Sequence, residues 1–212
     1  TRTSAFANRH IGIRGGTDVV LLGAIIKYML DNELYFHDYV VSYTNASSII
    51  SPDYQDTEDL DGLFSGYDPE TGKYVTDSWQ YVRKPEGSSW NVEKDETLQH
   101  PNSVFQILKR HYSRYTPELV EETCGISQED FYYLANSIAD NSKPDRTTCF
   151  AYALGFTQHT LGAQFIRTAA ILQLLMGNVG RPGSGIMALR GHASIQGSTD
   201  IPTLFNSLPV YL

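Results

Sequence analysis

The run VVLLGAIIKYML at residues 19–30 limits the fold more than any other part of the sequence. Apolar side chains occur on almost every face of the helix that it predicts, and such a helix must be covered by other elements. A turn, residues 14–18, precedes it, and Asp31 and Asn32 end it. The run is shorter than a membrane span and carries Lys27, so we expect no direct membrane insertion.

Composition excludes several classes of protein. The 212 residues suffice for one large domain or two small ones. A net charge of −8 argues against nucleic acid as a partner, because phosphate binding needs basic surfaces. Cys124 and Cys149 have neither CxxC spacing nor a histidine at ligand spacing, so we expect buried free thiols and no metal ligand.

Residues 45–100 differ in character from the rest. The segment is rich in Asp, Ser, Gly and Tyr, and it lacks helical periodicity. So long a connection is typical of an insertion or an interaction loop. Disorder is the alternative, but the aromatic residues weigh against it and suggest packing. They are Phe64, Tyr67, Tyr74, Trp79, Tyr81 and Trp90.

The remaining sequence predicts an α/β fold in which helices pack around parallel strands. Helices are expected at residues 37–43, 103–112, 117–124, 131–140 and 160–176, and buried strands at 147–153 and 186–189. A glycine-dense loop, residues 177–185, joins the last helix and strand. We predict three parts: the end of one α/β domain (1–44), the irregular insertion (45–100), and helices with an α/β segment (101–212).

Two turns could meet a ligand. Gln158 and His159 follow a strand and precede a helix, at the edge where open α/β sheets place ligands. A helix-capping pair is an equally good interpretation. In the turn before residue 19, Thr17 or Asp18 could cap the helix, and Asp18 could instead accept hydrogen bonds from a guanine edge.

The stretch LRGHASIQGSTD, residues 189–200, carries the densest polar chemistry. Arg190 presents a planar fork that suits a carboxylate, with a structural salt bridge as the alternative. His192 could tune charge or shuttle a proton, or it could be a satisfied core histidine. Gln196, Thr199 and Asp200 follow in the same short loop.

These motifs resemble those of a known family. The stretches TRTSAFANRHIGIRGGTD, DGLFSGYDPETGKY and YALGFTQHTLGAQFIRTAAILQLLMGNVGRPGSGIMALRGHASIQGSTD resemble the catalytic subunit of respiratory-type formate dehydrogenases, in the molybdopterin-guanine-dinucleotide oxidoreductase superfamily. The resemblance implies α/β domains around two pterin guanine dinucleotides that chelate molybdenum or tungsten. It assigns formate binding to Arg190, with His192 beside it.

The same resemblance implies three sets of cofactor-binding residues. Gly16, Thr17 and Asp18 would bind a guanosine portion. The cofactor cleft and the pocket floor would be formed by two further sets, Leu154, Gly155 and Gln158, and Gly191, Gln196 and Gly197.

Departures from the family pattern bear on activity. The family's iron–sulfur cysteines and its metal-ligating residue have no counterpart here, and Val210 stands where glycine is expected. We therefore expect an internal piece of a larger enzyme, without turnover or bound cofactor by itself, and with exposed apolar patches. Its partners would be formate, the rest of the catalytic subunit and an iron–sulfur electron-transfer subunit. The family suggests the periplasmic face of a membrane complex, with the cytoplasm as the alternative.

Three other functions remain open at this point. The chain could be a cofactor-free scaffold or interaction fragment. It could belong to another molybdopterin oxidoreductase, such as a nitrate-reductase-like enzyme, or it could be a stand-alone nucleotide-binding domain.

Overall fold

The structure, a computed structural model, describes residues 2–85, 91–191 and 197. The predictions made for His192, Gln196, Thr199, Asp200, Val210 and Trp90 lie outside these residues. The elements are η1 (Thr3–Phe6), α1 (Asp18–Asp31), α2 (His37–Tyr43), β1 (Tyr67–Asp68), β2 (Lys73–Tyr74), η2 (Asp77–Trp79), α3 (Val104–Tyr112), α4 (Pro117–Cys124), α5 (Gln128–Asp140), β3 (Cys149–Tyr152), α6 (Leu154–Thr157), α7 (Gly162–Leu175) and β4 (Gly185–Ala188).

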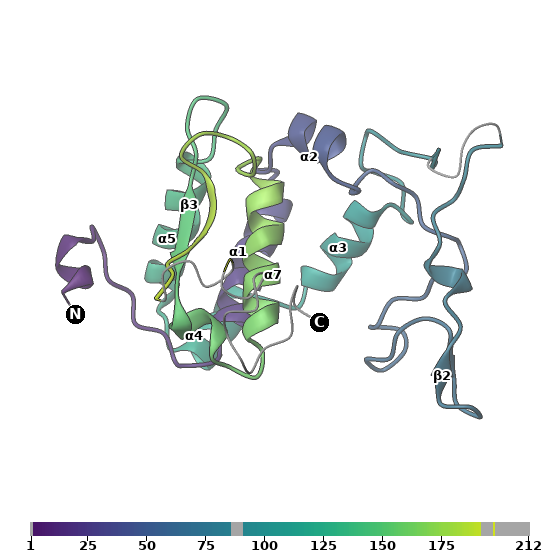
Figure 1. Ribbon diagram of the computed structural model, residues 1–212, viewed down its shortest axis with the longest axis horizontal. Helices are drawn as coiled ribbons and strands as arrows, with labels where there is room; N and C mark the ends of the chain where they lie inside the picture. Colours follow the sequence, from purple (N-terminus) through teal and green to yellow (C-terminus); the bar gives the residue numbers. More distant parts are fainter. Residues whose placement is uncertain (1, 86–90, 192–196, 198–212) are drawn as a thin grey trace.

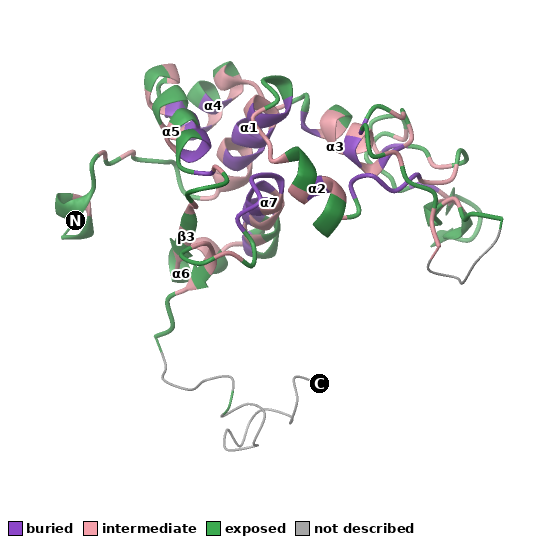
Figure 2. Ribbon diagram, turned by 90° about the horizontal axis from the view of Figure 1, so that it is seen from above, coloured by how far each residue is buried: buried purple, intermediate pink, exposed green. Residues whose placement is uncertain are grey.

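Helix α1 is the centre of the core, as its apolar sequence predicts. It packs against α3, α4, α5 and α7 (Figure 1). Ile25, Ile26 and Met29 are completely buried, and the buried residues of Figure 2 concentrate on α1 and its neighbours. No helix among the described residues has the length and apolar character needed to cross a membrane.

The ends of the helices follow from local sequence signals. The hydroxyls of Ser103, Thr116 and Ser127 accept hydrogen bonds from backbone N–H groups in the first turns of α3, α4 and α5. Gly125 ends α4 with a φ of 71°, which only glycine adopts without strain. The predicted cap of α1 is wrong. Thr17 is at the N-cap, but its hydroxyl donates to Arg14 O at 2.9 Å and caps nothing.

Strands β3 and β4 form a parallel pair, and together with the helices they confirm the α/β class. The prediction that the first strand is buried is wrong, because only one face of this two-stranded sheet is covered. Phe150 and Ile186 pack against the core, whereas Cys149 points the other way and is exposed. The predicted burial of both thiols therefore holds for Cys124 alone.

A buried polar network fastens the sheet to α7. Gln173 is completely buried, and its Nε2 donates to Thr148 O at 2.8 Å and to Gly185 O at 2.7 Å. Asn178 Nδ2 donates to Gln173 Oε1 at 2.7 Å and to Ser142 Oγ at 2.9 Å. These bonds hold the residue before β3 and the first residue of β4 against α7.

The described residues of the segment, 45–85 and 91–100, are mostly irregular, as predicted, and extend away from the helices (Figure 1). Isolated bridges connect the segment to itself and to Ser103, for example Ile50 with Tyr81. The aromatic residues pack mainly on one another, as Phe64 does on Tyr74 and Trp79. Phe64 nevertheless stays 57% exposed.

Candidate functional site

A cavity of about 530 Å³ lies where β3 and β4 end. Because the strands are parallel, their carboxyl ends share one edge, the place where open α/β sheets bind ligands. Leu189 N donates to Tyr152 O at 2.7 Å, which extends the pairing to the edge of the cavity. The lining residues are Tyr152, Ala153, Leu154, Thr157, Ala188, Leu189, Arg190 and Gly191.

Arg190 lies at this edge and is exposed. Among the described residues it makes no ion pair, so the salt-bridge interpretation finds no support there. Its positively charged guanidinium is therefore available to an anion that enters the cavity.

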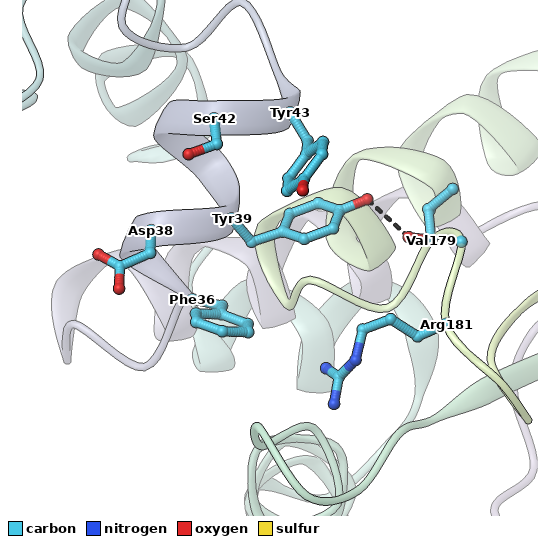
Figure 3. A pocket seen from close by; sticks show the side chains of 8 residues that line it. Phe36, Asp38, Tyr39, Ser42, Tyr43, Val179 and Arg181 are labelled. Atoms are coloured by element: carbon cyan, nitrogen blue, oxygen red, sulfur yellow. Dashed lines mark hydrogen bonds between the residues drawn. The ribbon is translucent and has the colours of Figure 1, made fainter.

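Arg181 shows what a structural arginine looks like in the same chain. It lines a second cavity, of about 500 Å³, between α2 and the loop after α7 (Figure 3). Its guanidinium donates to the backbone oxygens of Gly177, Lys143 and Pro144 at 3.2, 2.8 and 2.7 Å. These carbonyls engage both terminal nitrogens, so we assign Arg181 a structural role.

Helix α6 occupies the turn that was predicted to be a loop. Leu154 lies in its first turn and lines the cavity, while Gly155 follows and Gln158 ends the helix, donating its backbone N–H to Leu154 O at 2.9 Å. The long helix α7 begins only at Gly162. The helix expected from residue 160 therefore begins two residues later, and residues 154–157 before it are helical rather than a loop.

His159 connects this edge to the corner formed by residues 16–18. Its Nε2 lies 3.0 Å from Gly155 O, and its Nδ1 lies 4.0 Å from the place a Cβ on Gly16 would take. Gly16 has a φ of 87°, a conformation that favours glycine. The ring of His159 thus lies between Gly16 and Gly155, which belong to two of the three predicted cofactor-binding sets.

The last residue of α4 contacts the turn at residues 14–18 through hydrogen bonds. Arg14 N donates to Cys124 O at 3.0 Å, and Cys124 Sγ donates to Thr17 O at 3.5 Å. Burial raises the pKa of the Cys124 thiol, which keeps it neutral and able to donate. The half-buried Asp18 carboxylate accepts no hydrogen bond from any described residue, so both its oxygens are available to a donor.

Sequence reasoning located this edge but missed part of it. Tyr152 and Thr157 line the cavity without having been assigned to it, although a strand-end position would have indicated Tyr152. Gln173 was also missed, and its signal was a polar residue beside the apolar stripe of its helix. Gly197 is described by itself and is exposed, with nothing within 4 Å of a would-be Cβ.

No protein-family model matches the chain. The chain is 48% identical over 212 residues to the major subunit of the nitrate-inducible formate dehydrogenase of Escherichia coli. It is 45% identical over 211 residues to a formate dehydrogenase major subunit of Haemophilus influenzae, and 44% identical over 212 residues to a formate dehydrogenase subunit alpha of Megalodesulfovibrio gigas.

Each of these matches covers 100% of the chain and 20% of the relative, so the chain spans about a fifth of the length of these proteins. The resemblance found in the motifs is thereby confirmed from the first residue to the last. By sequence, the chain matches a segment of formate dehydrogenase major, or alpha, subunits over its whole length.

Proposed function

We propose that this chain is the part of a formate dehydrogenase catalytic subunit that orients formate beside a molybdopterin guanine dinucleotide centre. The observation that carries the proposal is Arg190, an exposed guanidinium at the shared edge of two parallel strands. The names of the relatives support formate oxidation in general. The assignments of substrate clamp, cofactor and metal are our own.

Arg190 would bind both oxygens of formate through its two parallel N–H groups. A carboxylate held in this way directs its C–H bond away from the fork, so one contact fixes the orientation of the reacting bond. Oxidation of HCOO⁻ releases CO₂, one proton and two electrons. His192, two residues along, would receive the proton or stabilise the charge near the anion.

The surroundings of the cavity fit a large nucleotide cofactor. Gly155 and Gly191 have no atom within 4 Å of a would-be Cβ, so the backbone at both places is open to close approach. Gly16, Thr17 and Asp18 would hold a guanosine portion, with the Asp18 carboxylate accepting from the guanine N–H edge. Leu154, Gly155, Gln158, Gly191, Gln196 and Gly197 would line the cleft. Molybdenum or tungsten on the bound pterins would supply the two-electron acceptor.

We further propose that the chain by itself neither holds the metal nor turns over formate. The resemblance places the metal-ligating residue and the iron–sulfur cysteines in other parts of the catalytic subunit, and the electrons would leave through an iron–sulfur subunit. Metal analysis and pterin fluorescence of the purified chain test this, with no molybdenum, tungsten or pterin expected. Stoichiometric metal or pterin would refute it.

The clamp is tested by Arg190→Lys in a complete formate dehydrogenase that contains this segment. Lysine keeps the charge but loses the second parallel bond, a loss of about 1.5–3 kcal/mol. We expect kcat/KM for formate to fall about 10–100-fold, with the metal and pterin content unchanged.

The matched control is Arg146→Lys, which changes an exposed arginine that is paired with its neighbour Asp145. It should leave kcat/KM within about twofold, because exposed pairs contribute little. Equal kinetics of Arg190→Lys and wild type would remove the physical basis of the formate clamp.

A further inference from the structure

Three residues outside the proposed active site have their ligand-capable atoms close together. Asp56, Glu58 and His111 each offer one such atom, and these atoms all lie within 4.8 Å of one another. Asp56 and Glu58 belong to the irregular segment, whereas His111 is in the last turn of α3. The cluster therefore lies where the irregular segment meets the helices.

Asp56 is a buried carboxylate with one unsatisfied oxygen. The residue is only 7% exposed, and its Oδ1 accepts a hydrogen bond from the Thr57 amide at 2.8 Å. Its Oδ2 is buried and has no hydrogen-bond partner within the part of the chain that the structure describes. A buried anionic oxygen without a donor is costly, so this atom indicates a missing positive partner.

The distance between the other two ligands suits a small cation. His111 Nδ1 and Glu58 Oε1 are 3.6 Å apart. A tetrahedral ion with bonds of about 2.1 Å places its ligand atoms about 3.4 Å apart, so a shift of a few tenths of an ångström would suffice.

A positive group already contacts these two ligands. The Arg114 guanidinium pairs with Glu58 and lies 3.2 Å from His111 Nδ1. Arginine only donates, so the contact is a hydrogen bond in the tautomer whose Nδ1 accepts, which is also the tautomer that can ligate a metal through Nδ1. Arg114 and Glu58 are each 42% exposed at their side chains, and an exposed pair of this kind is weak enough to be displaced.

The electrostatic surroundings also favour a cation. Asp56 and Glu58 line a cavity of about 520 Å³. Carboxylates outnumber cationic side chains in its lining, which comprises Asp31, Asp56, Glu58, Asp59, Gln106, Lys109, Arg110 and Ser113. One imidazole and two carboxylates suit zinc and similar first-row divalent ions better than Ca²⁺ or Mg²⁺, which take oxygen ligands.

We propose that Asp56, Glu58 and His111 bind one Zn²⁺-like divalent cation, which displaces Arg114 and fastens the irregular segment to α3. The site is separate from the cavity at the strand ends and needs neither formate nor a pterin. Its role would be structural, because ligands from two distant segments restrict both.

Zn²⁺ calorimetry on the purified chain tests the site, with Co²⁺ absorption as a second measurement and circular dichroism to verify folding. We expect one ion to bind per chain. Glu58→Gln, which changes an exposed residue, and His111→Gln should each weaken Zn²⁺ binding by at least roughly 10–100-fold. Losing a residue that only hydrogen-bonds to a ligand already costs about this much, and these two residues are ligands themselves. Asp56→Asn should do the same.

Asp59→Asn is the matched control, because Asp59 lines the cavity but is not in the cluster. It should change affinity by less than about threefold, since a charge that does not ligate acts only through space. Arg114→Gln removes the competing guanidinium and should tighten binding. Two results would overturn the proposal. One is a zinc affinity that neither Glu58→Gln nor His111→Gln changes, as expected for an ion held at the exposed Cys149. The other is a loss of affinity in Asp59→Asn equal to that in the cluster variants.

Discussion

Replacing Gln173 by Met tests whether the buried amide network holds the strands that form the proposed site. The side chains are similar in length, so the change removes hydrogen bonds without opening a large cavity. Three bonds disappear, namely those to Thr148 O, to Gly185 O and from Asn178 Nδ2.

The expected loss of stability follows from the buried polar partners that Gln173→Met leaves without a hydrogen bond. An unsatisfied buried partner costs about 1–3 kcal/mol, and two of the three partners are carbonyls, which tolerate a missing bond better than an N–H group does. We therefore expect the free energy of unfolding to fall by about 2–5 kcal/mol. At about 2–4 °C per kcal/mol for a chain of this size, the Tm should fall by roughly 4–20 °C.

Urea denaturation followed by circular dichroism gives the free energy from the midpoint at constant m-value. Gln164→Met is the matched control, because it makes the same change on an exposed position of the same helix. It should stay within about 0.5 kcal/mol of wild type. If both variants lose the same stability, the network does not hold the sheet.

Three further outcomes follow from the structure. Hydrogen bonds from Thr97 and from backbone N–H groups lower the pKa of Asp95 to about 2. The stability that Asp95→Asn removes at pH 7 should therefore shrink as pH falls from about 4 to about 2. A difference in urea midpoint between Asp95→Asn and wild type that stays constant over this range would contradict the prediction. Burial raises the pKa of Tyr112 to about 12, so its folded state favours the neutral phenol and stability should fall as pH rises from about 10 to about 12. Melting curves of Tyr112→Phe should lack that part of the decrease. A Cβ on Gly162 would lie 2.3 Å from Thr157 O, so Gly162→Ala should cost about 1–3 kcal/mol, whereas Gly155→Ala, with open space around it, should cost under about 1 kcal/mol in the same melts.

Much of the fold could be read from local signals in the sequence. The apolar run at residues 19–30 predicted the central helix, because a helix without a polar face needs neighbours on every side. The helices predicted from residues 103 and 117 begin at Val104 and Pro117, each after a hydroxyl residue that caps it, since capping is a contact between residues three apart. The motifs also sufficed to recognise the family that the comparisons confirm.

The proposed site was predicted only in part from sequence. Arg190, Leu154 and Gly191 line one cavity, but no local pattern shows that Gly16 approaches the same edge through His159. The one-turn helix α6 was missed because four residues hold too few periodic positions to distinguish a helix from a loop.

By itself, then, the sequence determined the positions of most helices, the α/β class and the family, because these depend on periodicity, capping and motif spacing. Only the tertiary structure decided which residues meet. It placed Cys149 on an uncovered face of the sheet. It let the Gln173 side chain hydrogen-bond to the backbone at the start of both strands, and it brought Asp56 close to His111. These contacts join residues far apart along the chain, and they form only when burial of the apolar core brings the segments together.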